Sequence, residues 1–94
     1  MSKKPKTAEE YLNRGAILSF GGDWDRALAD FNEAVRLDPN NASAWHSRGI
    51  AWKEKGELDK ALTDLDEAIR LDSNNQEVVK YRSLVIAKKS KQKR

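Results

Sequence analysis

The chain has 94 residues, of which 38% are hydrophobic and 35% are charged. This length suits one small domain with a single shared core, and this share of apolar residues excludes a chain that is disordered throughout. The absence of cysteine excludes disulfides, thiol catalysis and thiolate metal sites. No segment approaches the roughly 18 apolar residues that a membrane span needs, so we expect a soluble, cytoplasmic protein.

The charges are segregated along the chain. All fifteen acidic residues lie between positions 7 and 87, whereas eight of the eighteen basic residues lie near the two ends. The first ten residues, MSKKPKTAEE, have no apolar run behind their lysines, so we expect no secretion signal. We expect an acidic folded body with basic tails at residues 1–7 and 90–94.

The first predicted element is a helical hairpin over residues 8–41. Thr7 and Glu10 form a capping-box pair, which places a helix start near residue 8. Apolar residues recur at helical spacing on both sides of the segment GGD at 21–23, where glycine accepts the positive φ that ends a helix. The segment PNN at 39–41 then separates this unit from the next and supplies an asparagine cap.

The second predicted element repeats the first. Residues 42–75 align with 8–41 at a period of 34 without a gap, and ALTDLDEAIRLDSNN at 61–75 nearly copies ALADFNEAVRLDPNN at 27–41. Internal repetition at this period indicates stacked helical units that hide each other's apolar faces. Valine and isoleucine at helical spacing predict a fifth helix over 76–89.

The two units resemble the tetratricopeptide repeat, a 34-residue pattern of spaced aromatic, leucine-glycine, tyrosine, alanine, phenylalanine and proline positions. At these positions the first unit has Tyr11, Arg14, Gly15, Leu18, Ala27, Phe31 and Pro39, and the second has Trp45, Arg48, Gly49, Trp52, Ala61, Leu65 and Ser73. Arginine replaces leucine in both units, and serine replaces proline in the second. The resemblance covers residues 8–75, and the last helix is similar to the family's C-terminal capping helix. It implies an all-α fold, a right-handed α-α superhelix of two helix-turn-helix units with a fifth, capping helix.

Catalytic chemistry is not indicated. His46 has no cysteine or second histidine to join it, and the carboxylates fall at helix positions that we expect to face solvent. Neighbouring acids such as Asp64 and Asp66 are interpreted as a solvated helix face rather than a cation site. We therefore expect a non-enzymatic protein that has no metal and no cofactor.

In the resembled family, the first helix of each unit lines a concave groove that holds an extended peptide or a partner helix. The resemblance therefore implies a protein or peptide as partner. Transferred by position, the partner-binding groove, here called the predicted groove, is lined by Leu12, Ala16, Phe20, His46, Ile50, Lys53, Lys80 and Leu84. Its apolar strip suits apolar side chains of a partner. An alternative interpretation is that neighbouring helices partly cover Leu12 and Ile50.

One subclass of the family clamps the C-terminal carboxylate of a chaperone peptide with lysine, asparagine and arginine side chains at five positions. The matching positions here hold Leu12, Ala16, Ser47, Glu77 and Tyr81. None of the five clamp residues is kept. The resemblance therefore implies that this chain has no such carboxylate clamp.

Two other interpretations stay open. An exposed face of Val78, Arg82 and Val85 on the fifth helix favours self-association as a homodimer, unless the chain tolerates a moderately apolar cap as a monomer. The basic segment KKSKQKR at 88–94 favours attachment to nucleic acid or an anionic membrane surface. No aromatic residue in that segment can stack on bases and the acidic body repels phosphate, so a disordered, solubilising end is the preferred interpretation.

Overall fold

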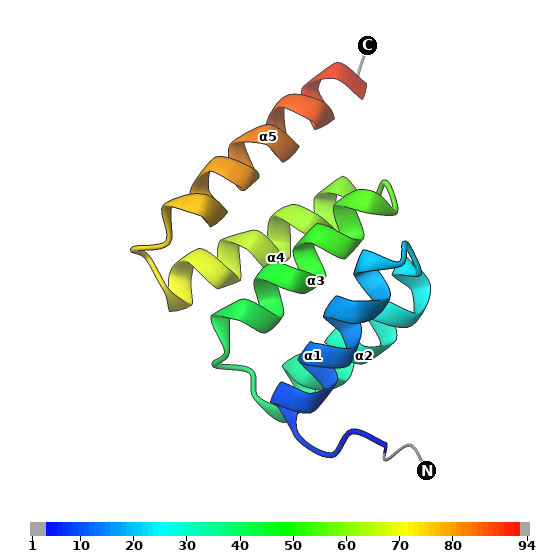
Figure 1. Cartoon of the computed structure of the whole chain (residues 1–94). Helices are drawn as coiled ribbons and strands as arrows, with labels where there is room; N and C mark the ends of the chain where they lie inside the picture. The colour runs from blue at the N-terminus through cyan, green and yellow to red at the C-terminus, as the bar shows by residue number, and fades with distance from the viewer. Residues whose placement is uncertain (1–3, 93–94) are drawn as a thin grey trace.

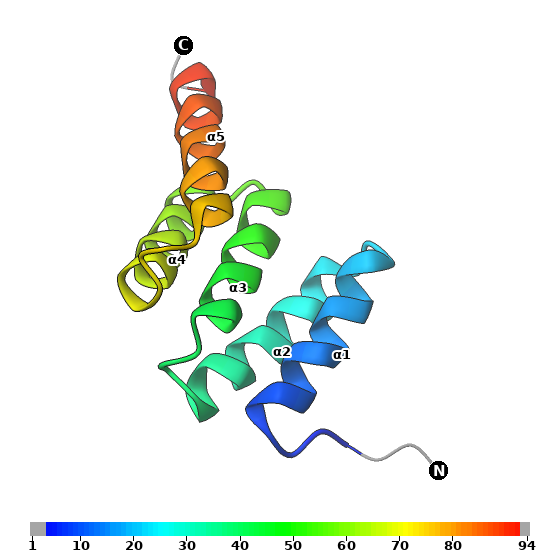
Figure 2. The same cartoon turned by 60° about the vertical axis from the view of Figure 1, so that its left-hand side comes forward.

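A computed structural model describes residues 4–92 of the chain. In this part the chain forms five α-helices and no strand: α1 (Ala8–Phe20), α2 (Trp24–Leu37), α3 (Ala42–Glu54), α4 (Leu58–Leu71) and α5 (Gln76–Gln92). The helix α1 packs on α2 and α3 on α4, while α2 contacts α3 and α4 contacts α5. The helices follow one another in chain order across an elongated body of 49 × 27 × 18 Å (Figure 1 and Figure 2).

The helix starts follow from local hydrogen bonds. The hydroxyl of Thr7 accepts from the backbone N–H of Glu10 at 3.1 Å, and the Glu10 carboxylate accepts from the backbone N–H of Thr7 at 3.1 Å. The predicted capping box is thus confirmed. Hydrogen bonds from Lys6 and then from Thr7 hold the pKa of Glu10 below its ordinary value. At α3, the side chain of Asn41 accepts from the backbone N–H of Ser43 at 3.0 Å.

The turns inside the two hairpins have the same geometry. Gly22 and Gly56 have φ angles of 79° and 83°, as predicted for the glycines that end the first helix of each unit. The residue after each glycine donates its backbone N–H back to the helix, Asp23 to Leu18 and Glu57 to Trp52, both at 2.9 Å. These bonds satisfy carbonyls at the helix end and reverse the chain direction.

The core is built on a close approach of the two helices in each unit. A Cβ atom at Gly15 would lie 2.5 Å from Cε1 of Phe31, and one at Gly49 would lie 3.1 Å from the side chain of Leu65. Fully buried alanines continue this close contact within the units at Ala27, Ala34 and Ala61, while Ala44 and Ala51 of α3 pack on α2 between the units. The absence of larger side chains at these positions lets the helix backbones approach one another.

One ion pair with a buried carboxylate joins the two helices of each unit. Nε and Nη2 of Arg14 donate to the two carboxylate oxygens of Asp30, both at 2.8 Å. Arg48 bonds Asp64 in the same way, at 2.8 and 2.9 Å. These two aspartates are only 4% and 2% exposed, so the expectation that the carboxylates face solvent is wrong for both. Arg14 and Arg48 stand at the positions where the resembled repeat pattern has leucine. Their guanidinium groups supply the charge-assisted hydrogen bonds that allow the two carboxylates to be buried.

The fifth helix packs on α4 through the valines that we expected to be exposed. Val78 and Val85 are 2% and 0% exposed and belong to one buried cluster with Leu65 of α4. Arg82 donates to the carboxylate of Asp66 on α4. The interpretation of Val78, Arg82 and Val85 as an open self-association face is therefore wrong, because this face is already used inside the chain.

The helix α5 is longer than predicted. It reaches Gln92, the last residue that the structure describes, rather than residue 89, so that residues 90–92, expected in the basic tail, are helical. Ser90 stands 34 positions after Gly56, and serine does not favour the positive φ at which the earlier hairpins turn. The outermost tail residues, 1–3 and 93–94, lie outside the described part of the chain.

We predict that Gly15→Ala lowers the free energy of unfolding by about 1 to 3 kcal/mol, because the added methyl group overpacks the buried ring of Phe31. Urea unfolding followed by circular dichroism measures the change. Gly21→Ala is the matched control, since the nearest atom to its Cβ is 3.6 Å away, and we expect a change within about 0.5 kcal/mol. Equal stabilities of the two variants would contradict the close helix approach.

Candidate functional site

The residues of the predicted groove lie on the three helices α1, α3 and α5. The helix α1 contacts α3, and α3 meets α5 where the rings of His46 and Tyr81 come together. Four groove residues are exposed, namely Ala16, Phe20, Lys80 and Leu84, and four are half-buried, namely Leu12, His46, Ile50 and Lys53. All eight therefore keep some accessible surface, and their role in binding stays a prediction.

The apolar end of the predicted groove lies on α1. Phe20 is 97% exposed, and Ile17, one turn earlier, is 71% exposed. Leu12 instead packs against the buried clusters that contain Phe31 and Ala34, which agrees with the alternative that neighbouring helices partly cover it. The accessible apolar surface of the predicted groove therefore lies at the C-terminal end of α1 and at Leu84 of α5, which is 65% exposed.

The centre of the predicted groove is aromatic and carries charges at its edges. The rings of His46 and Tyr81 meet edge to face, with centroids 6.3 Å apart. Burial lowers the pKa of His46, against a smaller opposite effect of the Glu77 carboxylate. Burial also raises the pKa of Tyr81 to about 12, and the charge of Glu54 acts in the same direction. Both rings are therefore held in their neutral forms.

Two residues of this surface were missed by the sequence analysis. Tyr81 occupies one of the five clamp positions, so its place on the groove side was available as a signal. Ile17 offered no such signal, because it stands 34 positions before the fully buried Ala51 and periodicity alone assigns it to the core. Its exposure follows from the lack of a described helix against this side of α1.

Two further cavities lie at equivalent places in the two units. One of 360 Å³ is lined by Arg14, Leu18, Arg26, Ala29 and Asp30, and one of 270 Å³ is lined by Arg48, Trp52, Lys60, Thr63 and Asp64. Each residue of the first set is followed 34 positions later by one of the second. These cavities therefore arise from the repeated hairpin geometry, and the ion pair of each unit forms part of the lining. No residue of the predicted groove lines either of them.

Residues 4–92 contain no cluster of three or more histidine, cysteine, aspartate or glutamate side chains that could hold a metal ion. Over the same range, none of the helices combines the length and the apolar character needed to cross a bilayer.

Comparisons with known proteins agree on one architecture. A family model described as tetratricopeptide repeat matches residues 7–76. The second TPR of Spaghetti (RPAP3) bound to HSP90 peptide SRMEEVD is similar, with a TM-score of 0.86 at 22% identity, covering 92% of this chain and 80% of that chain. The TPR2B domain of yeast Sti1, solved as a pHsp70 complex, has a TM-score of 0.76 at 32% identity, covering 90% and 70%. No curated protein sequence matches.

We predict that His46 titrates below the ordinary histidine value of 6.5, because its half-buried position disfavours the imidazolium. The imidazole proton shifts in an NMR titration measure this pKa, and His46 is the single histidine of the chain. Since the folded pKa lies below the unfolded one, protonation opposes folding, and the contribution of His46 to stability falls as the pH drops through this range.

The effect of Glu77 has a matched control. Glu77→Gln removes the charge that partly raises the pKa of His46, so the histidine should titrate still lower in this variant. Glu54→Gln should leave the His46 pKa unchanged, because the charge of Glu54 acts on Tyr81. A His46 pKa at or above 6.5 in the unmodified protein would contradict the burial of this ring.

Proposed function

The chain belongs to the tetratricopeptide repeat family, and from this premise we propose that it is a protein-interaction module that holds a peptide or partner helix along the predicted groove. The right-handed helical stack supplies a rigid surface and its side chains supply the contacts. Binding on a preformed surface needs little reordering of the protein, which favours affinity.

The observation that carries the proposal is the exposure of Phe20. A phenylalanine that is 97% exposed contributes nothing to the core, and it lies beside Ile17 and Ala16 on the same helix. Exposed apolar side chains that gather at one place mark interaction surfaces more often than chance positions do. We infer that this end of α1 receives apolar side chains of the partner.

The neutral rings of His46 and Tyr81 support a second contact further along the groove. Rings of this kind give contact area at low cost in conformational entropy and present hydrogen-bonding groups at their edges. Lys53 on α3 and Lys80 on α5 are the cations of the predicted groove and would meet polar groups of the ligand, although Lys53 also pairs with Glu54 at 3.0 Å. The proposed ligand is therefore a peptide or partner helix with apolar side chains for Phe20 and Leu84 and polar groups for Lys53 and Lys80.

The chaperone peptides seen in the similar structures are poor models for this ligand. The second TPR domain of human RPAP3, 25% identical over 84% of this chain and 66% of that chain, was solved with HSP70 peptide SGPTIEEVD at a TM-score of 0.81. In this chain the five clamp positions hold Leu12, Ala16, Ser47, Glu77 and Tyr81. Glu77 places a negative charge where the clamp needs a positive one. We therefore propose a ligand that is not recognised by a free C-terminal carboxylate.

We predict that Phe20→Glu weakens binding of groove ligands at least about tenfold, because a charge replaces the apolar contact. Peptides are selected on the unmodified chain from a random library displayed on phage, and their affinities are measured by fluorescence anisotropy. The melting temperature should stay unchanged, since the Phe20 side chain lies almost wholly in water.

Leu37→Glu is the control for this experiment. Leu37 is also an accessible large apolar residue, 39% exposed, but it lies at the end of α2 outside the predicted groove. The selected peptides should bind this variant as they bind the unmodified chain. Peptides that bind the Phe20 variant with undiminished affinity would place the ligand elsewhere and contradict the proposal.

We predict that the peptide SRMEEVD binds this chain no more tightly than the same peptide with an amidated C-terminus. A carboxylate clamp would distinguish the two peptides strongly, because amidation removes the charge that the clamp recognises. Isothermal titration of both peptides measures the difference. A clear preference for the free carboxylate would show that other cations, such as Lys53 or Lys80, replace the missing clamp.

A further inference from the structure

The ring pair of His46 and Tyr81 gives the second unit a feature that the first unit lacks. The two rings meet across α3 and α5 on the groove side, with centroids 6.3 Å apart. The residues 34 positions earlier are Leu12 and Ser47, neither of which changes its charge near neutral pH. At this level of the groove, the second unit therefore carries a side chain that can respond to pH.

The surroundings of His46 determine which form of the imidazole the groove holds. Tyr81 of α5 is the titratable ring that it touches, and Glu77 of α5 is the charged group that acts on it. Among residues 4–92, no charged side chain of α3 itself or of α1, α2 and α4 contributes to the pKa of His46. Burial outweighs the Glu77 carboxylate and lowers this pKa below its ordinary value. The ring is therefore neutral at neutral pH.

The nitrogens of His46 are available to a ligand. Within the described residues, neither nitrogen makes a hydrogen bond to a side chain or to the backbone, and the ring is only half-buried. A neutral imidazole has one nitrogen that donates and one that accepts. Protonation turns the acceptor into a second donor, so that a ligand N–H loses its partner.

The carboxylate of Glu77 disfavours an acidic ligand beside His46. Glu77 lies in the first turn of α5, is exposed, and makes no ion pair within the described part of the chain. A ligand carboxylate next to the imidazole would therefore meet a like charge that no cation neutralises. An uncharged polar group, such as a backbone N–H of a peptide, avoids this repulsion. Such a ligand brings no charge that stabilises an imidazolium.

Ligand binding and protonation of His46 therefore oppose each other. A ligand that covers the ring excludes water from it, which adds to the burial that already disfavours the imidazolium. Ile50, four residues later on the same helix face, extends the apolar surroundings of the ring. When a ligand lowers the pKa of a group, its affinity decreases as the pH falls through the pKa of the free protein.

We propose that His46 is a proton-controlled contact of the predicted groove: the neutral imidazole binds an uncharged polar group of the ligand, and protonation of the ring weakens the complex. The regulation rests on the proposed function, since it acts on a ligand in the same groove. The affinity of the groove decreases as its surroundings become acidic.

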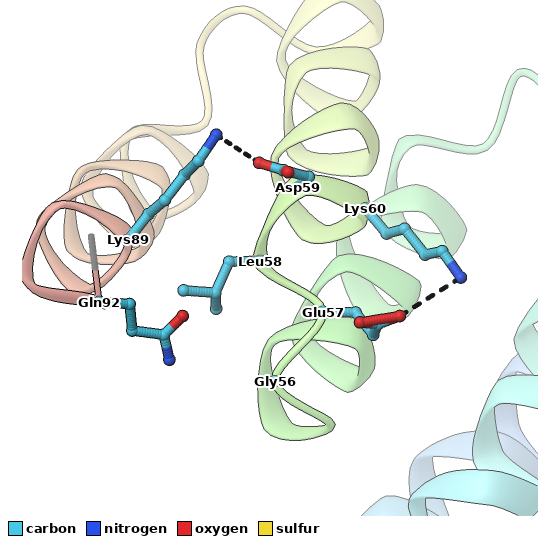
Figure 3. A pocket seen from close by; sticks show the side chains of 7 residues that line it. All are labelled: Gly56, Glu57, Leu58, Asp59, Lys60, Lys89 and Gln92. Atoms are coloured by element: carbon cyan, nitrogen blue, oxygen red, sulfur yellow. Dashed lines mark ion pairs between the residues drawn. The ribbon is translucent and has the colours of Figure 1, made fainter. Parts of the chain in front are cut away.

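A pocket elsewhere in the molecule serves as an internal control. This pocket of 470 Å³ lies between the start of α4 and the end of α5, where Lys89 pairs with Asp59 and Lys60 pairs with Glu57 (Figure 3). Its lining contains no histidine, because His46 is the single histidine of the chain. Amide NMR signals of the pocket residues should therefore stay unchanged when a ligand occupies the groove.

The probe is a groove peptide selected on the unmodified chain, chosen without acidic residues or histidine and amidated at its C-terminus. NMR measures the His46 pKa in the free chain and in the complex, and fluorescence anisotropy measures the affinity over the same pH range. Circular dichroism confirms that the chain stays folded there. We expect the peptide to lower the His46 pKa. The affinity one pH unit below the free pKa should be about five- to tenfold weaker than the affinity two units above it.

Three results of this experiment would overturn the proposal. The first is a His46 pKa that the peptide leaves unchanged or raises. The second is an affinity that does not change with pH. The third is a set of amide shifts at the pocket of Figure 3 in place of the groove, because the peptide would then bind away from His46.

Variants identify the group that carries the response. In His46→Gln, the affinity should no longer change with pH, and a remaining decrease would assign the response to another group. Glu77→Gln lowers the pKa of His46 further, so it should move the midpoint of the response to lower pH. Glu54→Gln is the matched control, because the charge of Glu54 acts on Tyr81. Equal midpoints in the two glutamate variants would contradict the proposed contact.

The proton-controlled contact and the groove itself fail in different ways. Phe20→Glu weakens the probe at every pH if the probe binds in the groove. If this variant loses affinity while the unmodified chain binds independently of pH, the role of His46 is wrong and the groove stands. If the probe binds the Phe20 variant with undiminished affinity, both proposals are wrong.

Discussion

The close approach of the two helices inside each unit is the contact on which the other features depend. At Gly15 and Gly49 any side chain would press on Phe31 or Leu65 of the facing helix. The same approach brings the arginine that precedes each glycine against an aspartate on the second helix. A wider spacing would leave that buried carboxylate without its donors, which is strongly unfavourable. In each unit, the glycine, the apolar side chain that faces it and the neighbouring ion pair therefore belong to one contact. The chain repeats this contact after 34 residues.

Much of this architecture was predictable from the sequence, because its signals are local. The capping box at Thr7 and Glu10 and the turn glycines Gly22 and Gly56 act within a few residues of themselves, so their geometry follows from residue type. The period of 34 then determines how the hairpins stack, since each unit must cover the apolar face of its neighbour. The family match over residues 7–76 agrees with this reasoning.

The errors arose where burial depends on a partner far away in the sequence. Asp30 and Asp64 look like solvent-facing acids on their own helices, and only the arginines sixteen residues earlier explain their burial. Val78 and Val85 were assigned to the open face of α5, although they stand 34 positions after the buried Ala44 and Ala51. The repeat register therefore indicated that these two valines are buried. Alanine occurs on both buried and exposed helix faces, so the alanines alone do not indicate which side of the helix is covered. For the predicted groove, the 34-residue repeat register shows on which side of a helix each residue lies. It does not show how much of that side chain stays exposed.

The exposed apolar side chains at the two ends of the stack, Ile17 and Ile86, have the same physical origin. In a stacked repeat, the helices before and after each helix cover its apolar faces. A face that has no neighbouring helix therefore still carries the apolar side chains of an internal contact. Ile17 is exposed on α1 at the register where Ala51 and Val85 are fully buried against the preceding unit. Ile86 is exposed on α5 at the register where Trp52 packs in the core. In the described part of the chain, the apolar side chains at the two ends of the stack are therefore uncovered halves of the repeating contact, whose covered halves stabilise the core through the burial of apolar surface.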